Sequence, residues 1–291
     1  MLARFRRRQG GLPYLLLAPG IAWLVVFFAV PLYYLAELSL KEGSIDVGYR
    51  FTWHFGTYAD AITNYSDQFL RSFEYAGLAT LLSLLIGYPL AYAIAFRGGR
   101  WRNALLLLVI LPFFTTYLVR TLSWQTILDD DGWVVSVLQT VGVLGDDGRL
   151  LATTAAVVAG ITYNFLPFMI LPLYASLERI DKRLHEAAYD LYGRRRDVFM
   201  RVTLPLSLPG IVAGVLLTFI PAAGDFVNSE LLGTPRQSMI GNVIQSRYLE
   251  ISDYPEAAAL SFTLMIAILA MVLVYARFAG TEQLTGAEAR Q

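Results

Sequence analysis

Six long runs of this 291-residue chain contain no Asp, Glu, Lys or Arg, and they constrain its fold more than any other feature. Each has about 17 residues or more, close to the 20 or so that a helix needs to cross roughly 30 Å of hydrocarbon. Because backbone polar groups in lipid must be hydrogen-bonded within their own segment, the runs predict six transmembrane helices in an all-α integral membrane protein. The third run is short, and Arg120 interrupts its continuation. The runs are Tyr14–Ala36, Tyr75–Phe96, Asn103–Val119, Leu151–Leu177, Val202–Gly224 and Ala257–Ala276.

The Lys and Arg residues are unevenly divided between the two sides of this predicted bundle. The N-terminus, the segments 97–103 and 178–201, and the C-terminus together carry 16 of the 23 basic residues. Basic residues favour the cytoplasmic side of a membrane protein, so both termini are expected in the cytoplasm. This pattern predicts a multi-pass membrane protein.

Composition excludes several functional classes. Charged residues make up 16% of the chain, against about 25% in a soluble domain. The basic residues are spread over positions next to the membrane, which gives no support for nucleic-acid binding. There is no cysteine, and His54 and His185 fall on opposite sides, so we expect no disulfide and no metal site. The runs lack the paired ionisable residues of a membrane-embedded enzyme, so no catalytic residue is assigned.

A strongly charged segment separates the fourth and fifth runs. Within it, residues 180–191 have apolar side chains on one face of a helix and charged ones around the rest, and Asp181 can cap the first turn. A second helical piece is expected at 197–202, with Phe199 directed inward. From the residues alone, this segment is either a compact knob that docks on a soluble partner or a solvated cytoplasmic loop.

The spacing within this segment resembles a known signature. Glu186-Ala187-Ala188 is followed by Phe199 after thirteen residues and by Leu204-Pro205 after eighteen and nineteen, as in the coupling loop of permease subunits of binding-protein-dependent ABC importers. The resemblance implies a type I permease fold with cytoplasmic coupling helices, located in the bacterial cytoplasmic (inner) membrane. Tyr192 stands where the family usually has glycine, and Gly193 follows it. The residues implied to contact the ATPase are Glu186, Ala187, Ala188, Asp190, Gly193, Phe199, Leu204 and Pro205.

Other segments resemble the spermidine/putrescine branch of these permeases. They are residues 112–124, 220–227, 230–233, 239–244 and 253–255, and the resemblance extends over about residues 15–278. It implies half of a polyamine pathway, completed by a second homologous permease subunit. Two ABC ATPase subunits, which bind ATP and Mg, and an extracytoplasmic substrate-binding protein are the other implied partners. The chain itself is expected to bind no cofactor.

The expected organisation is a basic cytoplasmic N-terminus at residues 1–13, a transmembrane permease domain at 14–278 with a coupling loop at 178–205, and a cytoplasmic tail at 279–291.

Polyamines carry several ammonium groups, which favour carboxylates and aromatic faces. A carboxylate at membrane depth is costly and therefore a candidate functional group. The candidates for the substrate pathway are Asp225, Glu230, Trp124, Tyr117, Tyr163 and Phe226. Two alternatives stay open: Asp225 pairs with Arg120 in a structural or gating salt bridge, or the aromatic residues belong to the interfacial belt.

Three local features complete the prediction. Residues 132–145 predict a short helix at the outer surface, with a loop packed on its own protein as the alternative. Pro205 is expected near the start of the fifth helix, and Pro221 near a break at its outer end. Gly210 and Gly214 allow close helix approach, within the chain or across a subunit boundary.

Two alternative functions remain from the sequence. One is ABC import of another small organic solute, such as an amino acid derivative or aminophosphonate. The other is ion-coupled secondary transport, which predicts inverted repeats and a midplane ion site that are not visible in the sequence.

Overall fold

The computed structural model describes residues 12–142, 144–145, 148–191 and 193–279. Most of the predicted N-terminal segment, the tail and Tyr192 therefore lie outside the described residues. The described chain forms two compact units. The first holds residues up to Asn64 together with Ile244–Thr263, and the second holds Tyr65–Val243 together with the residues from Leu264 onward.

The first unit contains helices and the one β-hairpin among the described residues. Strands β1 (Lys41–Ser44) and β2 (Gly48–Phe51) pair antiparallel, with Lys41 opposite Phe51. This hairpin is the exception to the predicted all-helical fold. The helical elements, some of which continue into the second unit, are α1 (Leu12–Leu24), the π-helical turn η2 (Val25–Ala29), α2 (Val30–Ser39), α3 (Gly56–Asn64), α13 (Ile240–Leu249) and α14 (Tyr254–Ala279).

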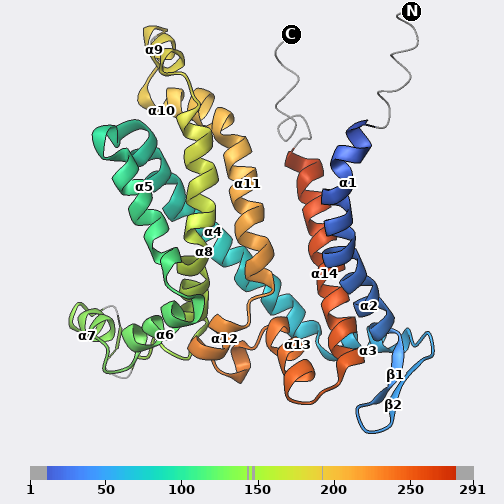
Figure 1. Ribbon diagram of the computed structural model, residues 1–291. Helices are drawn as coiled ribbons and strands as arrows, with labels where there is room; N and C mark the ends of the chain where they lie inside the picture. The colour runs from blue at the N-terminus through green and yellow to red at the C-terminus, as the bar shows by residue number, and fades with distance from the viewer. Residues whose placement is uncertain (1–11, 143, 146–147, 192, 280–291) are drawn as a thin grey trace, which may run out of the picture. The chain divides into compact units, whose positions relative to one another are not determined.

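The second unit is helical throughout its described part (Figure 1). Its elements are α4 (Ser66–Arg97), η3 (Gly99–Trp101), α5 (Arg102–Ile110), η4 (Leu111–Phe114), α6 (Tyr117–Leu128), α7 (Trp133–Thr140), α8 (Thr154–Glu178), α9 (Lys182–Asp190), α10 (Arg195–Val198), η5 (Phe199–Thr203), α11 (Leu204–Ala223), α12 (Val227–Leu232) and η6 (Pro235–Gln237).

The prediction of a helical membrane protein is confirmed. Five described helical segments are long and apolar enough to span a membrane, namely Leu16–Ser39, Ser66–Arg97, Thr154–Glu178, Arg195–Ala223 and Tyr254–Arg277. The third predicted span is broken, because Tyr117–Thr140 leaves Gly99–Phe114 at an angle of 95°. Thr115 and Thr116 at this break have extended backbone, with ψ of 148° and 149°.

Proline explains the irregular turns in the spans. The π-helical turn η5 ends two residues before Pro205, and η2 ends two residues before Pro31. A proline has no N–H and clashes with the carbonyl four residues earlier, so the preceding turn widens rather than closing normally. Helix α11 continues through Pro221 and ends at Ala223. The predicted break at the outer end therefore exists, a few residues after Pro221.

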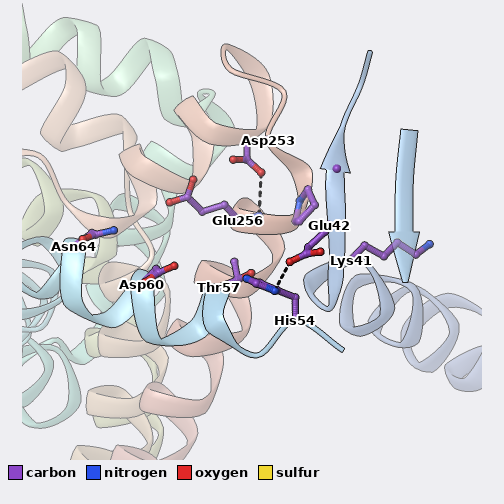
Figure 2. Close-up of a pocket in the computed structure, with 10 residues that line it drawn as sticks. Lys41, Glu42, His54, Thr57, Asp60, Asn64, Asp253 and Glu256 are labelled. Carbon is purple, nitrogen blue, oxygen red and sulfur yellow. Dashed lines mark hydrogen bonds and ion pairs between the residues drawn. The ribbon is translucent and has the colours of Figure 1, made fainter. Parts of the chain in front are cut away.

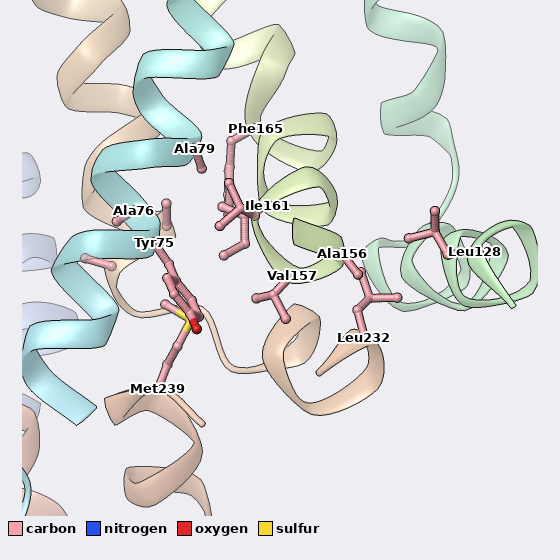
Figure 3. Close-up of a cluster of buried hydrophobic side chains, with 13 residues drawn as sticks. Tyr75, Ala76, Ala79, Leu128, Ala156, Val157, Ile161, Phe165, Leu232 and Met239 are labelled. Carbon is pink, nitrogen blue, oxygen red and sulfur yellow. The ribbon is translucent and has the colours of Figure 1, made fainter. Parts of the chain in front are cut away.

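Helices α4, α8 and α11 pack against one another and form the core of the second unit. Figure 3 shows the cluster in which Tyr75 and Ala79 of α4 lie near Ile161 and Phe165 of α8. A Cβ added to Gly210 on α11 would lie 2.5 Å from Ser176 Cβ and 2.7 Å from the Pro172 carbonyl oxygen on α8. Gly210 thus allows close helix approach within the chain.

Candidate functional sites

Helix α9 is the first of the two predicted pieces of the charged segment. Its Asp181 carboxylate accepts a hydrogen bond from the Arg183 backbone N–H at 2.9 Å, as an N-cap does. Leu184 and Leu191 are 47% and 82% exposed. The amphipathic helix is therefore confirmed, but part of its apolar face is not covered by the described chain.

The second piece begins two residues earlier than expected, at Arg195, and continues through η5 into α11 without a break. Phe199 lies edge-on to the rings of Tyr88 and Tyr92 on α4, with centroids 5.8 and 6.2 Å away. The inward direction predicted for Phe199 is confirmed. The ring of Phe199 and the continuous helix thus connect α10 to both α4 and α11.

Helix α9 is tied to the same structure by His185. Its Nε2 lies 3.0 Å from Thr203 Oγ1, and its ring packs edge-on against Phe96 at the end of α4. Gly193 joins the two helices, where an added Cβ would lie 2.4 Å from the Ala188 carbonyl oxygen. We call α9, α10 and η5 together the coupling knob (residues 182–203).

The structure distributes the predicted coupling residues over this knob and the start of α11. Glu186, Ala187 and Asp190 are exposed on α9, whereas Ala188 is half-buried. On α11, Leu204 is half-buried and Pro205 is exposed. Figure 1 shows α9 and α10 at one end of α8 and α11, and α6, α7 and α12 at the other.

Asp225 lies at that other end, just beyond the span that ends at Ala223. Its Oδ1 accepts hydrogen bonds from the backbone N–H groups of Val227 and Asn228, which caps α12. Its Oδ2 accepts from the Tyr117 hydroxyl at 2.7 Å and from the Asn228 side-chain amide. Burial raises the pKa of the Asp225 carboxyl above its ordinary value, and these hydrogen bonds oppose the rise.

The network around Asp225 includes residues that sequence reasoning missed. Asn164 on α8 donates to Asn228 Oδ1 at 3.1 Å and to Thr121 Oγ1 at 3.2 Å. Asn164, Thr121 and Asn228 are all buried, and together they join α6, α8 and α12. The available signal was Asn164 itself, a strongly polar side chain in the middle of a run without charges.

Arg120 is buried between aromatic rings. Its guanidinium carbon lies 5.3 Å from the Phe113 ring centroid and 5.6 Å from that of Tyr117. Its Nε and Nη1 have no hydrogen-bond partner among the described residues. The ion pairs of the described chain do not include Arg120 with Asp225. The structure thus places Arg120 against the ring of the tyrosine whose hydroxyl binds Asp225.

The remaining pathway candidates form two groups. Trp124 on α6 and Tyr163 on α8 are half-buried and pack together, with ring centroids 5.4 Å apart. Glu230 and Phe226 are exposed at α12. The structure therefore brings Tyr117, Trp124 and Tyr163 together along the contact of α6 with α8, and leaves Glu230 and Phe226 accessible.

A polar pocket of about 300 Å³ lies in the first unit (Figure 2). It is lined by β1, α3 and the start of α14, including Asp60 and Asp253. Its other carboxylates are already paired, since Glu42 contacts His54 and Glu256 contacts Arg247. In the described part of the chain, no group of three or more His, Cys, Asp or Glu gathers as a metal site.

Comparison with known proteins agrees with the architecture. The model of a family described as binding-protein-dependent transport system inner membrane component matches residues 79–280. The chain is 38% identical over 258 residues to the spermidine/putrescine transport system permease protein PotB of Salmonella typhimurium (strain SL1344), covering 88% of this chain and 90% of that protein. It is 35% identical to the inner membrane ABC transporter permease protein YdcU of Escherichia coli (strain K12), covering 74% and 72%.

Among solved structures, the fold is similar to a chain of a bacterial ABC transporter involved in the import of the acidic polysaccharide alginate. The TM-score is 0.70 at 21% identity, covering 96% of this chain and 98% of that chain. A chain of the MetNI methionine ABC transporter gives a TM-score of 0.52 at 14% identity, with 77% and 96% covered. These similarities concern the fold.

Proposed function

Because the chain belongs to the family of binding-protein-dependent transport system inner membrane components, we propose that it is a polyamine permease that forms half of a translocation pathway. It is a multi-pass permease of the inner membrane, and such an importer also requires an ATPase and a binding protein. The proposal adds the substrate class, a second and similar permease subunit, two ATPase subunits, and cytoplasmic termini.

The observation that carries the substrate class is the 38% identity to a spermidine/putrescine permease over 88% of the chain. A similarity of this extent covers the spans and the segments between them, rather than the coupling loop alone. The chemistry of the α12 region is compatible with a polycation, because Glu230 offers an exposed carboxylate and Phe226 an exposed ring.

We assign the pathway to the region where α6, α8 and α12 meet, with Glu230 and Phe226 as direct contacts. Asp225 and Tyr117 act there by holding the start of α12, since Asp225 is buried and accepts four hydrogen bonds. Trp124 and Tyr163 line the same contact between α6 and α8. Arg120 is a structural or gating residue that acts through the Tyr117 ring.

We assign ATPase docking to the coupling knob, within the proposed permease domain of residues 14–278. Exposed apolar residues on α9, beside the exposed Glu186 and Asp190, form a surface suited to a cleft in a soluble partner. The packing of Phe199 and His185 on α4, and the continuity of η5 with α11, give docking a rigid connection to the spans.

The test is reconstitution of the chain in proteoliposomes with the partner permease, the ATPase subunits and the binding protein. We expect ATP-dependent uptake of labelled spermidine or putrescine, and no ATP hydrolysis by the chain alone, because its sequence has no phosphate-binding Gly-x-x-x-x-Gly-Lys-Ser/Thr loop. ATP-dependent uptake of an aminophosphonate but not of a polyamine contradicts the substrate assignment. Uptake driven by an ion gradient without the ATPase contradicts the transport mechanism.

A further inference from the structure

Helix α7 (Trp133–Thr140) has three distinct faces. Val135 is fully buried and Leu138 is half-buried, on the side where α7 packs against α6. Trp133 and Val137, followed by Val141 one turn later, are 68%, 51% and 70% exposed and lie on one side. The adjoining exposed side carries hydroxyl groups only, from Ser136 and Thr140. Contact with the rest of the chain therefore accounts for one face, and leaves an apolar face beside a polar one.

The direction of this segment follows from the broken span. Residues 99–114 form the first half of the broken span, and Leu107 and Leu108 on this half are exposed apolar residues. Tyr117–Thr140 leaves that element at 95°. A segment at nearly a right angle to a spanning helix lies close to the plane of the bilayer. Figure 1 shows α7 at the end of the second unit opposite the coupling knob.

The charged residues next to α7 indicate how deeply this helix can lie in the bilayer. Asp129, Asp130 and Asp131 precede α7 and are exposed, and Asp130 pairs with Arg149 at 3.0 Å. Carboxylates this close to the helix keep it out of the hydrocarbon core. Tryptophan is enriched at the membrane–water boundary, where its ring is partly in lipid and its N–H reaches polar groups.

We propose that α7 is an interfacial helix that inserts Trp133, Val137 and Val141 into the lipid headgroup boundary on the membrane side away from the coupling knob. The occupant of the exposed apolar face is lipid, and the face with Ser136 and Thr140 is in water. The anchor fixes the far end of the segment that begins with α6, which carries Tyr117 and Trp124. In this proposal, lipid contact at α7 supports the bend at residues 115–116, in addition to the packing of α6 and α7 on the rest of the chain.

The chain has no cysteine, so a single cysteine can carry a nitroxide in the assembled transporter when the other subunits are also free of cysteine. The labelled positions are Val137→Cys and Val141→Cys on the apolar face, and Ser136→Cys on the polar face. Leu108→Cys on α5 is the reference for lipid. Power-saturation spectroscopy in proteoliposomes measures collisions with oxygen, which concentrates in lipid, and with a water-soluble nickel chelate.

We expect oxygen collisions to exceed nickel collisions at positions 137 and 141, less strongly than at 108 because the boundary is shallower. At position 136 the order reverses. If positions 137 and 141 are as accessible to nickel as position 136, the face is in water and the proposal is wrong. Low access to both reagents shows a protein partner instead, and also overturns it. ATP-dependent transport by each labelled variant verifies its fold independently of these readings.

Discussion

At the scale of single residues, Asp225 and Glu230 lie only five positions apart but have opposite environments. The Asp225 carboxylate is buried, and two backbone N–H groups, a phenol and a side-chain amide donate to it. Glu230 is exposed on the helix that Asp225 caps. Because the oxygens of Asp225 already accept hydrogen bonds, this carboxylate is suited to stabilising the local structure. The exposed carboxylate of Glu230 is free to bind a cation from solution.

Asp225→Asn tests the holding role. The single oxygen of the new amide can still accept from the backbone at the start of α12. Its NH₂ group, however, replaces the carboxylate oxygen to which Tyr117 and the Asn228 side chain donate. A buried donor facing donors costs about 1–3 kcal/mol. We expect a lower midpoint of thermal unfolding in detergent and a lower yield of assembled complex. Asp131→Asn, at an exposed acid, is the control, with a change within about 0.5 kcal/mol. Equal midpoints for the two variants would contradict the role.

Glu230→Gln tests the cation contact. An exposed ion pair contributes roughly 0.2–1 kcal/mol, which corresponds to polyamine uptake slower by a factor of about 1.4 to 5. Assembly and basal ATP hydrolysis should stay at their normal levels, and the difference from the unmodified protein should shrink at high salt, because exposed charges are screened. Initial rates of labelled spermidine uptake at two salt concentrations measure it. Uptake that is unchanged at low salt removes Glu230 from the pathway.

At the scale of elements, the contact between α8 and α11 depends on the absence of a side chain. Around Gly210, the two helices approach closely enough that an added Cβ would meet both a side-chain carbon and a backbone oxygen. Without a hydrophobic driving force in lipid, helices associate through such close packing, which small residues permit. The turn before Pro205 is widened, whereas α8 remains α-helical through Pro167 and Pro172, and the two helices pack against each other in spite of these prolines.

Gly210→Ala should therefore push α8 and α11 apart. Overpacking typically costs about 1–3 kcal/mol, so we expect a lower midpoint of thermal unfolding. Gly77→Ala is the matched control, because Gly77 also lies inside a helix but an added Cβ there meets nothing within 4 Å. The control should be neutral or more stable by about 0.5–1 kcal/mol. A Gly210→Ala variant as stable as the control would show that α8 and α11 can move apart at this position without a measurable loss of stability.

At the scale of the whole molecule, α8 and α11 run the length of the second unit between the coupling knob and the region where α12 meets α6 (Figure 1). The knob is attached to α11 by a continuous helix and to α4 by aromatic contacts. In our proposal, a displacement of the knob by the ATPase moves these helices as a body and changes access at the opposite end.

Glu186→Arg tests this connection. The side chain is exposed on α9, so its reversal should leave the fold unchanged while placing a mismatched charge in the docking contact. We expect ATP hydrolysis to continue while the amount of spermidine imported per ATP falls, with the affinity for the binding protein unchanged. Parallel assays of hydrolysis and uptake in proteoliposomes measure that ratio.

The control is Asp131→Arg, an equal reversal of charge at the opposite end of the second unit, which should keep the normal ratio. If Glu186→Arg also keeps it, Glu186 is not part of the docking surface.

The sequence by itself determined five of the six predicted spans and the two helices of the knob. Hydrophobic runs and the helical spacing of residues 180–191 are local signals, since they depend on the period of one segment and on the length needed to cross lipid. The Asp181 cap and the break near Pro221 follow from the same local chemistry. The β-hairpin escaped this reasoning, because its strands are short and carry no strong alternating pattern.

The tertiary structure alone decided which polar residues meet. Asp225 and Tyr117 are 108 positions apart in the chain, and Asn164 and Asn228 are 64 apart. No period in the sequence links such pairs, and each becomes a neighbour only when α6, α8 and α12 pack together. The sequence left open a salt bridge between Asp225 and Arg120. In the structure both residues contact Tyr117 instead: Asp225 accepts a hydrogen bond from its hydroxyl, and Arg120 lies over its ring. Partner choice inside the bundle depends on three-dimensional packing, which local patterns do not encode.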